Sequence, residues 1–203
     1  MYIPNIYKNE NISQIKEFIS QNGFAIVVSQ TNTKFAATHI PLQLDKDNND
    51  EDILIGHLSK QNPQAINIKD NDEVLVIFNG PHAYISSSWY QKEEVPTYNY
   101  IAVHIYGTIK TLSSEELMNS LKKLVDTYEQ NIQNPVSVEK MSSKTLQQIN
   151  GIVGFSINIK EIQAAYKLSQ NRNKKDYQNI INQLENEEIS NNKEVAKEMK
   201  NIK

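Results

Sequence analysis

The stretch "YNYIAVHIYGTIKTL", residues 98–112, decides how this chain of 203 residues folds. Its β-branched and aromatic residues predict a strand, but fifteen residues exceed the length of an ordinary one. Gly107 lies within the run and predicts a bend or bulge. We therefore expect one long strand that serves two parts of a small β-barrel.

Shorter β-rich runs surround this strand. They are separated by turn chemistry such as "TNT" (31–33) and "NGP" (79–81), and only "NPQAINI" (62–68) interrupts them as a short helix. Short connections favour antiparallel pairing, so the expected class is mainly β with peripheral helices (α+β), mostly antiparallel. The expected strands are 24–30, 34–44, 52–59, 73–80, 82–90 and 98–112, with 152–159 as a seventh.

Helical periodicity appears at both ends of the strand-rich region. The segment 11–23 predicts an amphipathic helix, with Asn11 as its N-cap and with Ile12 on the apolar face. A helix after residue 112 opens with a capping box of Ser113 and Glu116, and a shorter one is expected over 143–149. We expect a domain over 1–172 and a C-terminal tail over 173–203 of one or two marginal helices, fraying towards Lys203.

Composition restricts the possible functions. The chain has no Cys, so disulfides, thiolate zinc sites and a cysteine nucleophile are excluded. It has no signal-peptide pattern and no apolar run of membrane-spanning length, which indicates a cytoplasmic, soluble protein without a membrane partner. The net charge is −3, with 21 basic and 24 acidic residues, so no global positive field favours nucleic acid. Arg172 is the only Arg.

The four His residues do not form a metal-binding pattern. They lie in or beside predicted strands, in "ATHIP", "GHLSK", "GPHAY" and "AVHIY", without HxH or HExxH spacing. Separate, locally hydrogen-bonded His residues are the simpler interpretation. The chain also lacks GxSxG, GxxxxGK[ST] and GxGxxG motifs, so no catalytic residue is assigned.

Two polar segments could hold a phosphate. In "GHLSKQNPQ", Ser59 and Lys60 precede Asn62, a candidate N-cap, and Pro63 at the first helical position. "KLSQNR" (167–172) places two cations around amide and hydroxyl groups. A helix start after a Lys and a solvated loop explain these two patterns equally well.

The stretch "GPHAYISSSWYQKEEVPTYNY", residues 80–100, concentrates aromatic and hydroxyl groups. Gly80 and Pro81 predict a turn, and "QKEE" (91–94) an exposed loop. If 82–90 is a strand, its alternation places Ala83, Ile85 and Ser87 on an apolar face, and the hydroxyl-rich groups on the other. Buried polar groups need partners, so this second face indicates the wall of a polar cleft.

Taken in order, "MYIPNIY", "ATHIPL", "GHLSKQNPQ", "VIFNGPHAYISSSWY", "VPTYNYIAVHIYG" and "KLSQNR" resemble the PaiB family of FMN-binding negative transcriptional regulators. The resemblance runs from Met1 to about Arg172. It implies a flavin-binding split β-barrel, with a homodimer that holds FMN in clefts between its subunits. The family often has Pro at the position of Ser87 and Trp at that of Tyr98.

The resemblance also implies which residues contact FMN. "ATHIPL" would lie along the flavin ring, "GHLSK" near the phosphate, and "KLSQNR" close to the cofactor. The candidate cofactor-binding residues are Thr38, His39, Ile40, His57, Ser59, Lys60, Asn62, His82, Tyr84, Ser86, Trp89, Thr97, Asn99, Lys167, Gln170, Asn171 and Arg172.

Two functions follow from this resemblance. The first is a regulator of transcription that binds FMN, acting on DNA or through another regulatory partner, although no basic recognition helix is evident. The alternative is an FMN-dependent oxidoreductase, a flavin reductase or oxidase, in which His39, His82 and Tyr84 would be the nearest proton-handling groups.

Overall fold

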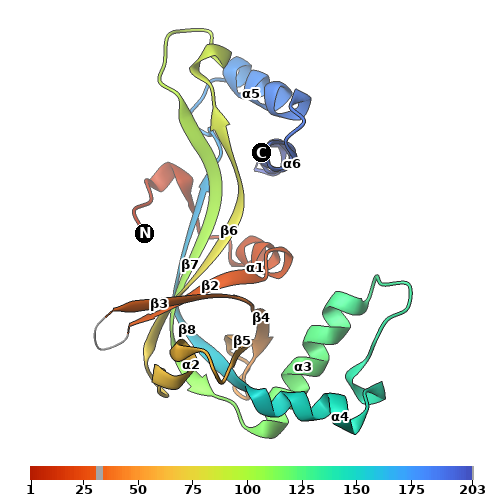
Figure 1. Cartoon of the computed structure of the whole chain (residues 1–203). Helices are drawn as coiled ribbons and strands as arrows, with labels where there is room; N and C mark the ends of the chain where they lie inside the picture. The colour runs from red at the N-terminus through yellow and green to blue at the C-terminus, as the bar shows by residue number, and fades with distance from the viewer. Residues whose placement is uncertain (31–33, 203) are drawn as a thin grey trace. The chain divides into compact units, whose positions relative to one another are not determined.

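An antiparallel sheet dominates the computed structural model, which describes residues 1–30 and 34–202 (Figure 1). The strand order is β3-β2-β6-β7-β8-β5-β4, and β1 pairs with β8. The pairs β1–β8, β2–β3, β2–β6, β4–β5 and β5–β8 are all antiparallel, as expected. The strands are β1 (Lys8–Asn9), β2 (Phe24–Gln30), β3 (Phe35–Pro41), β4 (Gln43–Lys46), β5 (Asp52–Ser59), β6 (Glu73–Ile85), β7 (Thr97–Thr111) and β8 (Ile152–Lys167).

Helices lie at the ends of the strands and in the C-terminal segment. The α-helices are α1 (Ile12–Gln21), α2 (Pro63–Asn67), α3 (Ser114–Glu129), α4 (Ser143–Leu146), α5 (Lys174–Asn186) and α6 (Ser190–Asn201). Short 3-10 helices cover Asn5–Tyr7, Ser87–Trp89, Val138–Lys140 and Gln147–Gly151. Within residues 1–30 and 34–202, no helix is both long and apolar enough to span a bilayer.

The chain divides into two compact units. Unit 1 comprises Met1–Phe18, Phe78–His104 and Gln163–Lys203, and unit 2 comprises Ile19–Ile77 and Ile105–Ile162. Each of β6, β7 and β8 contributes residues to both units. The expectation that one long strand serves two parts of the structure is therefore confirmed for β7. The division into 1–172 and 173–203 stays a prediction.

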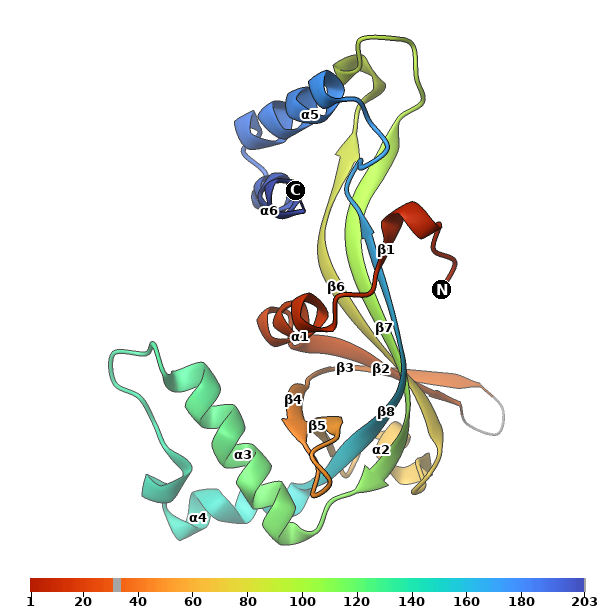
Figure 2. The ribbon, with the colours of Figure 1, turned by 180° about the vertical axis from the view of Figure 1, so that it is seen from behind.

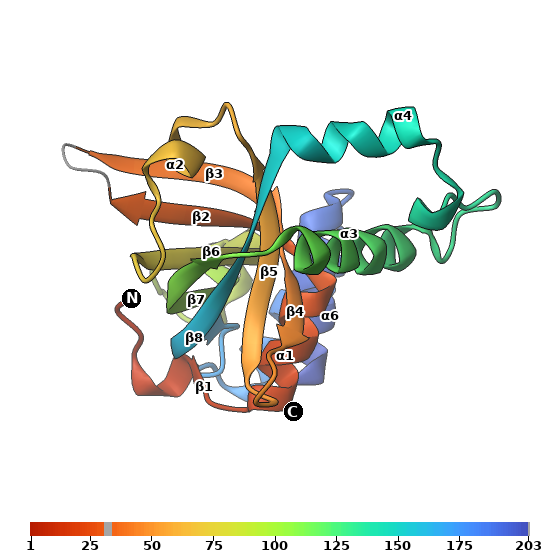
Figure 3. The ribbon, with the colours of Figure 1, turned by 90° about the horizontal axis from the view of Figure 1, so that it is seen from below.

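Unit 2 has a core built by alternating strand residues. Val27, Leu54, Val76, Ile105 and Ile157 are fully buried and come from β2, β5, β6, β7 and β8. Side chains at every second position of a strand share one face, so these residues gather on the same side of the curled sheet. Figure 3 shows α2 beside β3 in this unit.

Gly107 lies in unit 2, and the bend or bulge expected there stays a prediction. Its backbone lies against β8 so closely that a Cβ would collide with the carbonyl oxygen of Asn158 and with the side chain of Ile157. The residue therefore permits close strand packing.

Unit 1 packs α5 and α6 side by side (Figure 2). The tail holds two helices, as expected, and their few apolar residues share one face. Ile180 and Leu184 on α5 and Val195 on α6 are fully buried, and the Tyr177 hydroxyl donates to the Met199 carbonyl. Spacing of three and four residues gives each helix an apolar stripe that the other covers.

The helix caps agree with the sequence. Asn11 Oδ1 accepts the Gln14 N–H at 3.2 Å, and the Ser113–Glu116 capping box is complete. The expected helix over 143–149 is present as α4 and the 3-10 turn after it. Ile12, placed on the buried face of α1 by the periodicity, is instead 49% exposed, because the helix buries the side of Ile15.

Two predicted strand boundaries are wrong. There is no turn at Gly80 and Pro81, since β6 continues to Ile85. Pro81 is tolerated because β2 pairs with β6 only from Val74 to Ile77, so the missing N–H lies beyond that pairing. The run 34–44 divides into β3 and β4 at Leu42, whose N–H turns to donate to the Gly23 carbonyl. The predicted turn "TNT" (31–33) and the end of the tail at Lys203 lie outside the described residues.

Candidate functional site

The candidate cofactor residues fall into two groups, one in each unit. Unit 2 holds Thr38, His39, Ile40, His57, Ser59, Lys60 and Asn62. Unit 1 holds His82, Tyr84, Ser86, Trp89, Thr97, Asn99, Lys167, Gln170, Asn171 and Arg172. We describe each group within its own unit.

In unit 2 a hydrogen bond joins the two motifs. Asn62 caps α2, accepting the Gln64 N–H at 2.8 Å, while its Nδ2 donates to the Thr38 hydroxyl on β3 at 3.0 Å. Pro63 is the first residue of the helix, as the sequence predicts. "ATHIPL" and "GHLSKQNPQ" therefore come together between β3 and the turn from β5 to α2.

Gln64 anchors the start of α2 to β2 and β3. Its side chain is 2% exposed, and its Nε2 donates to the carbonyls of Val27 and Ala36 and to the Ser29 hydroxyl. A buried amide with several partners holds a helix start more firmly than α2, at five residues, could by itself. The turn that carries Ser59 and Lys60 is thus anchored to β2 and β3.

Ser59 and Lys60 are exposed at the turn from β5 to α2. The Ser59 hydroxyl accepts the Gln61 N–H at 3.2 Å, and the Lys60 backbone N–H donates to Gly151. The Lys60 ammonium forms no ion pair within the described part of the chain. A hydroxyl and an available cation at one turn are the groups that a phosphate needs.

The other unit 2 candidates differ in accessibility. His39 is exposed on β3 beside the Phe24 ring, with a centroid separation of 6.2 Å. Ile40 is buried and its side chain belongs to the core. His57 on β5 is half-buried, and this burial lowers its pKa, so the imidazole is neutral at pH 7. Of these three residues, only His39 is exposed.

In unit 1 the "KLSQNR" segment forms a constrained turn after β8. Ser169 adopts a left-handed backbone with φ of 62°, which is unfavourable for a residue with a Cβ. Its buried hydroxyl donates to Asn99 Oδ1 at 3.0 Å, and the Asn99 amide contacts the Met199 sulfur at 3.5 Å. Asn99 is fully buried. Asn99 therefore holds the turn and offers no exposed side-chain atom to a cofactor.

The Arg172 side chain already has partners within unit 1. Its guanidinium pairs with Glu94 at 3.1 Å and lies over the Tyr90 ring at 4.2 Å from the centroid, leaving the Arg side chain 15% exposed. Glu94 belongs to the loop that the sequence predicts to be exposed. The sole arginine thus fastens this loop to the turn after β8.

Lys167 lies near Arg172 and is also engaged. Its ammonium donates to the Thr97 hydroxyl. Burial lowers the pKa of Lys167, and the positive charge of Arg172 lowers it further. Two neighbouring cations form a positive region, but each already has a partner in unit 1.

The remaining unit 1 candidates are mostly used within the unit. Ser86 caps the 3-10 helix by accepting the Ser88 N–H, and the Trp89 carbonyl accepts from Asn179. His82 lies 3.4 Å from the Asn191 amide. Tyr84 stands out because it is 50% exposed.

The strand predicted over 82–90 ends at Ile85, and the predicted alternation of buried and exposed side chains is present only up to that residue. Ala83 and Ile85 are buried and Tyr84 is exposed, meeting Tyr98 edge-to-face with centroids 5.8 Å apart. The serines follow in the 3-10 turn, so strand alternation does not apply to Ser87. After β8, Gln170 folds onto its own turn by accepting the Leu168 N–H at 2.8 Å, whereas Asn171 is exposed.

Sequence reasoning missed the partners of Arg172. Glu94 and Tyr90 are far from Arg172 in the sequence, and no spacing rule connects them. The sequence signals available were a single Arg and, far from it in the chain, a charged loop at 91–94. Over residues 1–30 and 34–202 there is no group of three metal-ligating side chains.

Comparison with known proteins identifies the family. The family model described as "Putative FMN-binding domain" matches residues 1–161. The chain belongs to this family. It is 48% identical to the Protease synthase and sporulation protein PAI 2 of Bacillus subtilis, over 98% of this chain and 96% of the relative. An uncharacterised protein of Emericella nidulans is 29% identical over 92% of this chain and 91% of its own length. The chain is thus an FMN-binding protein of the PaiB type.

Solved structures support the fold. The FAD and heme binding protein from Mycobacterium smegmatis superimposes with a TM-score of 0.63 at 12% identity, over 79% of this chain and 73% of that one. The flavocytochrome Anf3 from Azotobacter vinelandii gives 0.59 at 15% identity, over 85% and 75%. The expected split-barrel class is confirmed. The family match ends before "KLSQNR", so the role of that turn depends on the geometry of unit 1.

Proposed function

We propose that this chain is an FMN-dependent regulatory protein, and that the FMN phosphate binds at the turn from β5 to α2. The observation that carries the phosphate site is the Asn62–Thr38 hydrogen bond, which joins the two family motifs beside the exposed Ser59 and Lys60. When bound, FMN supplies reversible redox chemistry, and the protein supplies its position and electrostatic environment.

Competition for cations favours this turn over "KLSQNR". Arg172 would have to leave Glu94 and Tyr90 before it bound a phosphate, and Lys167 would have to leave Thr97. Among residues 1–30 and 34–202, the Lys60 ammonium has no ion-pair partner to release. A phosphate therefore replaces only water at Lys60, and it gains charge-assisted hydrogen bonds without breaking internal ones.

The phosphate site is tested by comparing FMN with riboflavin, which lacks the phosphate. Lys60→Ala should raise the Kd for FMN about tenfold to a hundredfold, the value of one charge-assisted hydrogen bond of ~1.5–3 kcal/mol. The Kd for riboflavin should stay unchanged. Lys69→Ala is the matched control, because Lys69 is an exposed lysine just beyond α2. Equal losses for both flavins, or no loss for FMN, would reject this phosphate site.

The regulatory role is proposed from the sporulation protein named above and from the charge of the chain. The net charge of −3 gives no general attraction to DNA, so we propose that the chain acts in the cytoplasm, as a homodimer, through a protein partner. Sedimentation should show a dimer at micromolar concentration. A gel shift with the upstream region of its own gene should show no sequence-dependent binding at moderate salt. Such binding would show direct action on DNA.

A further inference from the structure

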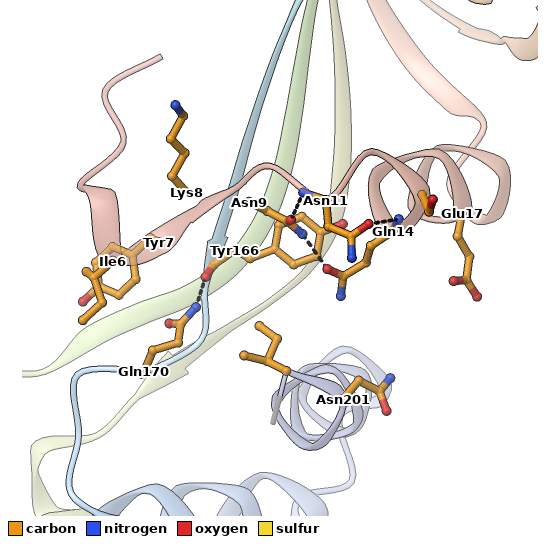
Figure 4. A pocket seen from close by; sticks show the side chains of 12 residues that line it. Ile6, Tyr7, Lys8, Asn9, Asn11, Gln14, Glu17, Tyr166, Gln170 and Asn201 are labelled. Atoms are coloured by element: carbon orange, nitrogen blue, oxygen red, sulfur yellow. Dashed lines mark hydrogen bonds between the residues drawn. The ribbon is translucent and has the colours of Figure 1, made fainter.

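A cavity of about 620 Å³ lies in unit 1, and its lining residues include none of those at the proposed phosphate site. Its walls come from the N-terminal residues 6–9, the start of α1, Tyr166 on β8, Gln170, and the end of α6 at Asn201 (Figure 4). This volume falls within the range of small-molecule sites. Gln170 is the one residue it shares with the candidate cofactor group.

Carboxamides supply most of the polar groups of this cavity. Asn9 Nδ2 donates to Gln14 Oε1 at 2.8 Å, and Asn9 Oδ1 accepts the Asn11 N–H at 2.9 Å. These bonds fix the amides relative to one another before a ligand arrives. Each carboxamide carries both donors and an acceptor, so the cavity suits a ligand whose edge alternates acceptors and donors. The five carboxamides are Asn9, Asn11, Gln14, Gln170 and Asn201.

One lysine and one glutamate line the cavity. Lys8 and Glu17 are its only ionisable side chains besides the two tyrosines. Lys8 pairs with Glu10 at 2.5 Å, and Glu17 also interacts with another group of the chain. A ligand with a net charge would therefore gain little here, whereas a neutral polar ligand would keep its hydrogen bonds.

Tyr166 lines the cavity, and its hydroxyl is buried in the wall beside Asn9. The residue is 3% exposed, and its oxygen has no hydrogen-bond partner of ordinary geometry among the described residues. Burial raises the pKa of Tyr166, although Asn9 beside it acts in the opposite direction. The phenol thus stays protonated at neutral pH and can both donate and accept. Leaving a buried polar group unpaired is unfavourable, and a ligand whose polar edge reached the Tyr166 hydroxyl would remove that cost.

Flat and apolar groups complete the lining. Tyr7 contributes a half-buried ring, and Ile6 and Ile202 lie at the wall. Aromatic rings stack on flat heterocycles, and carboxamides pair with the donor and acceptor edges of nucleobases. We propose that this cavity binds the base of a neutral nucleoside, with Tyr166 and the carboxamides on its polar edge.

The test uses adenosine, guanosine, cytidine and uridine as probes on the full chain, with and without saturating FMN. At least one nucleoside should bind saturably by calorimetry and raise the Tm, because a ligand that binds only the folded state stabilises it. It should bind equally in the presence of FMN. Failure of all four would overturn the proposal. Binding only of phosphorylated forms, or loss of binding when FMN is present, would overturn it as well.

Two variants locate the site. Tyr166→Phe keeps the ring, which packs edge-to-face on Phe18, and removes only the hydroxyl, so the nucleoside should bind about threefold to tenfold more weakly. Tyr100→Phe makes the same change on β7 outside the cavity and should leave binding within twofold of the parent. FMN affinity should be unchanged in both. Equal effects of the two variants would show that the nucleoside binds elsewhere.

Discussion

Replacing Asn99 by Ala should destabilise unit 1 through a single buried contact. Asn99 is fully buried and accepts a hydrogen bond from Ser169, which is itself 3% exposed. The Ala variant loses that bond and leaves the Ser169 hydroxyl unpaired. It also leaves a void where the carboxamide was.

The size of the effect follows from these losses. A neutral hydrogen bond contributes ~0.5–1.5 kcal/mol, and a buried hydroxyl without a partner costs ~1–3 kcal/mol. The void adds to this cost, since surrounding residues relax only partly. We expect the free energy of unfolding to fall by about 2–4 kcal/mol.

Urea denaturation followed by circular dichroism at pH 7 measures this change. Asn48→Ala, in an exposed turn, is the control and should change the free energy of unfolding by less than about 0.5 kcal/mol. Adding Ser169→Ala to the Asn99 variant should recover roughly 1 kcal/mol relative to additivity, because it removes the unpaired hydroxyl. A loss below about 0.5 kcal/mol for Asn99→Ala, or strict additivity, would refute this reasoning.

Three further predictions concern other contacts. Glu94→Gln should lower the free energy of unfolding by less than about 1 kcal/mol, since Glu94 is 43% exposed, and should leave the FMN Kd within twofold; a marked change in FMN binding would instead implicate Arg172 in the phosphate site. Because burial lowers the folded pKa of His57, the unfolded chain takes up a proton first, so stability should fall as pH drops from 7 through about 6.5. His57→Gln should flatten that dependence in urea titrations, and an unchanged slope would contradict it. Gly107→Ala should destabilise by ~1–3 kcal/mol through the clash with Asn158, seen as a lower Tm, and an unchanged Tm would show that β7 can move away.

Local rules predicted the elements whose signals are themselves local. The α2 cap at Asn62 and the capping box at Ser113 depend on residues a few positions apart, and both are present as expected. The Gly80–Pro81 pair misled the prediction because its turn propensity is real in isolation. At this point β6 continues past the end of its pairing with β2, and this is seen only in the register of the sheet.

The candidate site was predictable to the level of motifs. The sequence located Ser59, Lys60 and Asn62 before a helix, and the structure adds the bond to Thr38. The sequence could not show that Arg172 would pair with Glu94, because contacts between distant segments depend on tertiary packing. The same limit explains why Asn99 seemed available as a cofactor ligand.

The most direct test of the account is a crystal structure of the chain with FMN bound. We predict that the FMN phosphate lies within hydrogen-bond distance of the Ser59 hydroxyl and the Lys60 ammonium, with the Arg172–Glu94 pair intact. A phosphate held by Arg172 and Lys167, with Glu94 displaced, would contradict it.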